Sequence, residues 1–164
     1  MDYALRAQYL DGLHDLHRRD GATAVCAEIL QNLSDGRGKL WTMHRALDTR
    51  NKLPHLFRLG EYIPLTVEGE KQQHVIAFLR RDTATKQTVL VAVPRFSCTL
   101  MQAKPHLPLA DAWGKATLSL PQDVTGSFKN IFTDAELKPD DGGVLSLHDI
   151  FAEFPVAMLV SNDQ

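Results

Sequence analysis

Apolar residues in the first third of the chain recur at steps of three and four, which is the period of an α-helix. The first stripe predicts a helix from Asp2 to Arg19, with Asp2 as its N-cap, and Asp20-Gly21 ends it. A second helix is expected to end in the turn Ser34–Gly38, and a third runs towards Leu53. The apolar positions that define the three stripes are Leu5, Tyr9, Leu13 and Leu16, then Val25, Cys26, Ile29, Leu30 and Leu33, then Leu40, Met43, His44 and Leu47.

The period changes after Gly60 to one that is typical of β-strands. Pro54 suits the first residue of a short turn of helix, and we expect Gly60 to end that turn in the left-handed conformation. The segments that follow are short, rich in β-branched and aromatic residues, and separated by hairpin-length connections, so they predict an antiparallel meander. Pro64 favours an edge position for the first strand, because proline cannot donate to the ladder. The three segments are residues 62–67, 74–81 and 87–93.

Further elements are expected towards the end of the chain. Residues 116–120 and 128–132 are strand candidates, and residues 147–151 suit a short helix. The apolar run at 155–160 has the length of a buried last strand. About six short strands after a helical part predict an α+β fold, in which N-terminal helices pack against a C-terminal antiparallel β-sandwich. The expected division is a helical segment at 1–53 and a β domain at 54–164.

Composition narrows the possible partners. The chain has 164 residues, 44% apolar and 23% charged, with a net charge of −2, and this balance lacks the basic surplus that a polyanion-binding domain usually needs. No apolar run reaches the roughly 18 to 20 residues of a membrane span, and Met1-Asp2-Tyr3 does not begin a signal peptide. We therefore expect a cytoplasmic protein without a nucleic-acid or membrane partner.

Candidate ligand sites are weak when they are considered residue by residue. His14 and His17 can share one helix face and a metal, but no third ligand is near them in the sequence, and a solvated helix surface is the better interpretation. Ser34–Lys39 carries glycines and basic residues but lacks the phosphate-loop pattern, which favours a helix-to-helix turn. The acidic loop lacks the spacing of a calcium loop, which favours a solvated connection. Its acidic residues are Asp134, Glu136, Asp140 and Asp141.

Candidate catalytic residues are equally isolated. Cys26 and Cys98 are the only cysteines and are expected to be reduced, partly buried thiols. Trp41 and Trp113 could stack on a sugar ring, but we expect them in the core. The carboxylates fall on helix faces and in turns and do not form the pair that cleavage of a glycosidic bond needs. The sequence therefore predicts no catalytic residue, no cofactor and no metal ligand.

Seven segments, in collinear order over nearly the whole chain, resemble the C-terminal end of malto-oligosyltrehalose synthase, a trehalose-forming member of the α-amylase superfamily. The stretches 96–111 and 122–143 contribute least to the resemblance. The segments are Met1–Arg6, Gly38–Trp41, Leu56–Leu65, His74–Arg81, Val89–Arg95, Ala112–Gly114 and Glu153–Leu159.

The resemblance implies a fold and an activity. In that family a large (β/α)-barrel precedes an antiparallel β-sandwich, and this chain looks like the last barrel-associated helices plus the sandwich. The full-length enzyme is an isomerase of carbohydrate metabolism: by intramolecular transglucosylation it converts the reducing-end α-1,4 bond of a maltodextrin into the α,α-1,1 bond of trehalose. Its aspartate nucleophile and glutamate acid/base lie on barrel strands that have no counterpart here, so no catalytic residue is carried over. The implied partners are the barrel of the same enzyme and, through it, maltodextrin.

Two alternative functions remain open, and the missing barrel has a physical consequence. The chain could be an α-glucan-binding module that uses Trp41, Trp113 or Tyr62, or a stand-alone interaction domain. If the third helix normally packs on the barrel, its apolar face loses a partner in this chain. We then expect self-association through the first 53 residues, or refolding of those helices onto the sheet.

Overall fold

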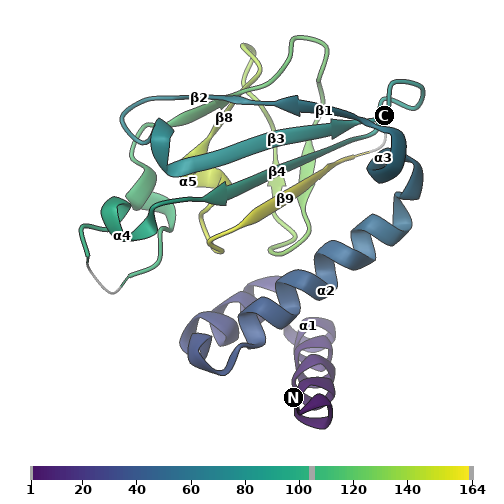
Figure 1. Cartoon of the computed structure of the whole chain (residues 1–164), viewed down its shortest axis with the longest axis vertical. Coiled ribbons are helices and arrows are strands. Elements are labelled where there is room, and N and C mark those ends of the chain that lie inside the picture. The colour runs from purple at the N-terminus through teal and green to yellow at the C-terminus, as the bar shows by residue number, and fades with distance from the viewer. Residues whose placement is uncertain (1, 104–105, 163–164) are drawn as a thin grey trace.

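The computed structural model describes residues 2–103 and 106–162, so Met1, which begins the first family segment, lies outside the described residues. Helices form the N-terminal third, and antiparallel strands in two sheets follow (Figure 1). The predicted α+β class with antiparallel sheets is confirmed. Within residues 2–103 and 106–162, no helix combines the length and apolar content that crossing a bilayer requires.

Helix α1 spans Tyr3–Gln31 and changes direction at Gly21. Asp2 caps it as predicted, since the Asp2 side chain accepts a hydrogen bond of 2.9 Å from the Leu5 backbone N–H. Gly21 has φ 85° and ψ −179°, a backbone conformation outside the helical region, so the predicted break at this residue is confirmed as a kink between two helical halves. The first half points away from the sheets (Figure 1).

Two further helices lead to the sheets. A short 3₁₀ turn at Leu33–Asp35 and left-handed Gly36 connect α1 to α2, Arg37–Lys52. Helix α3, Pro54–Leu59, begins at the proline as predicted.

The expectation that Gly60 adopts the left-handed conformation is wrong. Its backbone is extended, with φ −60° and ψ 147°. Glycine is required for another reason: a Cβ at this position would lie 2.3 Å from the Leu56 carbonyl oxygen and 2.9 Å from that of Arg81. The last turn of α3 and the end of β3 (Val75–Arg81) can thus lie close together only because residue 60 has no side chain.

The larger sheet has six strands in the order β1-β3-β4-β9-β6-β7. The sequential pairing β1-β3-β4 confirms the predicted meander, and Pro64 lies on the edge strand β1 as expected. The predicted last strand is also present, and it lies inside the sheet between β4 and β6. The six strands are Glu61–Pro64 (β1), Val75–Arg81 (β3), Thr88–Pro94 (β4), Phe128–Asn130 (β6), Glu136–Leu137 (β7) and Ala157–Ser161 (β9).

The smaller sheet has three strands in the order β2-β5-β8, and it changes the predicted boundaries. The segment expected as one strand at 62–67 divides at Leu65 between the two sheets, while the Leu65 N–H still donates to the Ala77 carbonyl at 3.0 Å. The sequence did not predict β7 or β8, which are two and three residues long. The three strands are Thr66–Glu68 (β2), Thr117–Ser119 (β5) and Val144–Ser146 (β8).

Short helical segments complete the connections between strands. The predicted short helix near residue 147 is confirmed as α5. The sequence did not predict the others. These elements are Gln72–His74 (3₁₀), Ser97–Leu100 (α4), Ala110–Trp113 (3₁₀) and Leu147–Ile150 (α5).

Two hydrophobic clusters hold these layers together. One contains side chains of both sheets, such as Leu79 and Leu118, together with Trp113. The other joins the helices to the opposite face of the larger sheet, so the N-terminal helices pack against strands. Its members are Leu13, Val25, Cys26, Ile29, Trp41, Leu56, Val89, Ile131, Phe132, Phe154 and Met158. The sandwich and the boundary after residue 53 remain predictions.

Candidate functional site

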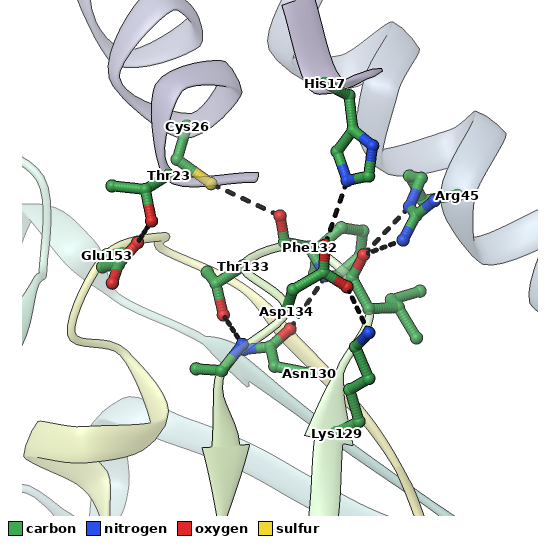
Figure 2. A network of polar contacts seen from close by, with 12 residues as sticks. His17, Thr23, Cys26, Arg45, Lys129, Asn130, Phe132, Thr133, Asp134 and Glu153 are labelled. Carbon is green, nitrogen blue, oxygen red and sulfur yellow. Dashed lines mark hydrogen bonds and ion pairs between the residues drawn. The ribbon is translucent and has the colours of Figure 1, made fainter. Parts of the chain in front are cut away.

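A network of polar contacts joins α1 and α2 to residues 131–135, the turn between β6 and β7 (Figure 2). His17 Nε2 lies 3.0 Å from Asp134 Oδ2, and Lys129 Nζ lies 2.9 Å from Asp134 Oδ1. Asp134 adopts a positive φ of 58°, which aspartate tolerates better than most residues. One carboxylate on the turn therefore binds a side chain from α1 and another from β6.

Backbone carbonyls of the same turn bind two further helix residues. The Arg45 guanidinium of α2 donates to the Ile131 carbonyl oxygen from Nε at 2.9 Å and from Nη2 at 2.6 Å. The Cys26 thiol of α1 donates to the Phe132 carbonyl at 3.4 Å. Asn130 shapes the turn from within, because its side-chain oxygen accepts the Phe132 N–H at 3.0 Å. Figure 2 shows these contacts converging from both helices on one short segment.

The electrostatics of the turn favour a charged Asp134. Desolvation by burial raises the pKa of this carboxyl, but hydrogen bonds from Lys129 and His17 outweigh it and leave the pKa below its usual value. The prediction of a solvated acidic loop is wrong at this residue, which is only partly exposed. It holds at Asp140, an exposed residue whose side chain accepts the N–H groups of Gly142 and Val144 in a local turn.

His14 and His17 are partly buried and contact other side chains, so the interpretation of this pair as a freely solvated helix surface is not confirmed. They do share a face, as predicted, and both rings pack on Trp41, with centroid distances of 5.3 Å and 5.9 Å. His14 Nε2 lies 2.9 Å from His44 Nε2, whereas His17 binds Asp134. Among the residues that the structure describes, no three side chains of His, Cys, Asp or Glu converge as metal ligands would.

The remaining candidates on the helices have structural roles. In the predicted helix-to-helix turn at Ser34–Lys39, which is confirmed, Asp35 accepts the Arg37 N–H at 3.0 Å. Arg37 also forms ion pairs with Asp35 and Glu28, and the pair with Glu28 joins α2 to α1. Burial raises the pKa of the Cys26 thiol to about 12, so it stays protonated and unreactive, whereas Cys98 is exposed.

The aromatic candidates for sugar binding divide into buried and exposed residues. Trp41 and Trp113 are fully buried, so neither can stack on a glucan, and the prediction that both belong to the core is confirmed. Tyr62 is 53% exposed on the edge strand, with its ring centroid 4.9 Å from that of Phe78. Of the three residues proposed for glucan binding, only Tyr62 remains accessible.

A polar cavity of about 400 Å³ lies at the far end of β3. Arg81, which is almost completely buried, donates to Asp123 at 2.6 Å. The hydrogen bond from Arg81 holds the pKa of the Asp123 carboxyl below its usual value. Among the described residues lining this cavity, Asp123 is the single acid, so the cavity does not provide the two carboxyl groups of a glycosidase.

Comparison with known proteins tests the family resemblance. No protein-family model matches the chain. Over 125 residues, which make up 76% of this chain, the sequence is 31% identical to the maltooligosyl trehalose synthases of two Mycobacterium tuberculosis strains. The matched region is 14% of each relative, so the chain corresponds to a small fraction of their length.

A solved structure of a mutant maltooligosyltrehalose synthase from Arthrobacter ramosus shares the fold. The TM-score is 0.58 at 24% identity, and the match covers 86% of this chain and 16% of that one. The chain is thus similar in sequence and in fold to a small part of maltooligosyl trehalose synthase, which confirms the family resemblance of its sequence.

Proposed function

We propose that this chain is the C-terminal accessory region of a maltooligosyl trehalose synthase and that it caps and supports the catalytic (β/α)-barrel. The similarity to a small part of much longer enzymes supports this assignment. In the proposed full-length enzyme, the barrel isomerises the reducing-end α-1,4 bond of a maltodextrin to the α,α-1,1 bond. The nucleophile and the acid/base then belong to the barrel, so the isolated chain is inactive.

The observation that carries the proposal is an exposed apolar face of α2. Met43 and Leu47 are one helical turn apart and are 51% and 52% exposed. Trp41 and Thr49, on the other side of the helix, are buried. A helix with apolar residues on two faces is expected between two packed layers, and here the larger sheet supplies one of them.

The other two members of the predicted apolar stripe are partly covered within the chain. Leu40 is half-buried, and His44 turns towards His14 on α1. Met43 and Leu47 therefore define the exposed part of the stripe, and we assign them to the surface that meets the barrel. The helical segment 1–53 then lies between the barrel and the β domain 54–164.

A chimaera tests this role directly. Two forms of the Mycobacterium tuberculosis relative are made: in one, the segment that matches this chain is deleted, and in the other it is replaced by residues 1–164. Formation of the α,α-1,1 bond from maltopentaose is then measured for both. We expect the deleted form to lose activity and the chimaera to recover it. A second chimaera with Met43→Lys and Leu47→Lys should fail to recover activity, because two ammonium groups cannot be buried against the barrel.

Matched variants separate docking from folding. A chimaera with Ile76→Lys, a substitution of an exposed residue on the sheet, should remain active. A soluble chimaera that stays inactive, or an isolated chain that converts maltopentaose unaided, contradicts the proposal. If maltoheptaose shifts the NMR signals of Tyr62 in the isolated chain, the glucan-binding alternative is favoured instead.

A further inference from the structure

The contact between α1 and α2 includes two imidazole rings that share one hydrogen bond. His14 Nε2 and His44 Nε2 are 2.9 Å apart, and the ring planes are almost perpendicular, at 86°. A nitrogen–nitrogen hydrogen bond needs one protonated and one unprotonated partner, so only one hydrogen can lie between the two atoms. When both rings are fully protonated, two N–H groups and two positive charges face each other.

The surroundings of His14 oppose its protonation. Burial lowers the pKa of this imidazole, and the nearby groups His44, Arg45, Arg18 and His17 lower it further. Trp41 packs against both rings and supplies no charge, with centroid distances of 5.3 Å to His14 and 6.2 Å to His44. Asp48 lies one turn beyond His44 and interacts favourably with positive charge on that ring. However, its carboxylate also interacts with Arg45 and forms an ion pair with Lys52 at 2.7 Å.

The neighbouring histidine contacts a carboxylate instead of a second imidazole. His17, one turn further along α1, has the Asp134 carboxylate 3.0 Å from Nε2. Hydrogen bonds keep the pKa of Asp134 below its usual value, so this carboxylate stays charged in mild acid. A protonated His17 therefore forms an ion pair with the turn, which Lys129 shares from β6.

We propose that the His14–His44 contact is a pH-sensitive latch, which separates α1 from α2 in mild acid while the His17–Asp134 contact keeps α1 on the β6–β7 turn. The latch follows from the packing of this chain and does not depend on the proposed function. It predicts a local loss of order between the two helices instead of general unfolding.

The direction of the pH effect follows from linkage. A histidine whose pKa in the folded chain is below its ordinary value of 6.5 binds more protons in the open or unfolded form than in the closed form. The stability that the closed contact contributes is therefore present above pH 6.5 and is lost as the pH falls below that value. Neutral imidazoles close the latch, and protonation of both rings opens it.

Hydrogen exchange of the full chain tests the latch at about pH 7.5 and about pH 5.5, on either side of the ordinary pKa of histidine. After correction for intrinsic exchange, we expect amides on the facing sides of α1 and α2 to lose several-fold protection in acid, while the β6–β7 turn keeps its protection. In His14→Gln and in His44→Gln this difference between the two pH values should disappear. His148 binds Asp149 and lies on the short helix α5 instead of α1 or α2, so His148→Gln should leave the response as in the parent chain.

The titration of the rings provides a readout that does not require the variants to fold. NMR signals of the imidazole nitrogens of the parent chain should show His14 titrating below free histidine. The proposal is overturned if His14 titrates as a free imidazole, if His14→Gln keeps the full acid response, or if the turn opens together with the helices.

Discussion

At the scale of single residues, Gly60 shows how one missing methyl group sets the junction between helix and sheet. We expect Gly60→Ala to lower the free energy of unfolding by about 1–3 kcal/mol, because the new Cβ meets two backbone oxygens that cannot move aside as a side chain would. Urea denaturation measures the loss. Gly12→Ala is the matched control: nothing lies within 4 Å of its Cβ, and the exchange should stabilise α1 by about 1 kcal/mol. Equal stability of the two variants would contradict the steric explanation.

Residue-scale features could be predicted where their physical cause is local. The Asp2 cap and the Pro54 helix start depend on neighbours within one turn, and both are confirmed. The partners of His14 and His17 could not be found in this way, because His44 and Asp134 are 30 and 117 residues away in sequence. The spacing of the two histidines correctly indicated a shared face, and only the fold reveals what covers it.

At the scale of elements, the kink of α1 depends on backbone dihedral angles alone. Gly21 combines φ 85° with ψ −179°, a region almost restricted to glycine, while a Cβ would meet nothing within 4 Å. We expect Gly21→Ala to cost about 1–3 kcal/mol in unfolding free energy or to straighten the helix and expose Val25 and Ile29. Urea denaturation with hydrogen exchange of these two residues distinguishes the two results. A variant with unchanged stability and unchanged protection would show that the kink carries no strain for alanine.

Element types were easier to predict than element ends. Three helices and the β1-β3-β4 meander follow from periodicity, because each buries a regular stripe of the chain. Periodicity does not reveal that the segment 62–67 divides at Leu65, because one apolar segment supplies edge strands to two different sheets. Strands as short as β7 are held by the neighbouring strand and leave almost no pattern of their own.

At the scale of the whole molecule, the exposed face of α2 predicts association of the isolated chain. We expect sedimentation velocity to show concentration-dependent self-association, because Met43 and Leu47 present apolar surface that a second copy can cover. The double variant Met43→Lys and Leu47→Lys should remain monomeric, and Ile76→Lys should associate like the parent chain. A parent chain that sediments as a monomer at every concentration, with its helices fully protected, would contradict this expectation.

The position of β9 inside the larger sheet governs how this protein can be synthesised. Val91 of β4 pairs with Met158, so the apolar edge of β4 stays open until the ribosome has delivered the distant β9. At a typical elongation rate of about 5–20 residues per second, the edge of β4 remains unpaired for several seconds before β9 has been synthesised. During this interval the segment Thr88–Pro94 can add to the strands of another nascent polypeptide. Recombinant yield should therefore depend on chaperone capacity and growth temperature more than the stability of the finished fold would suggest.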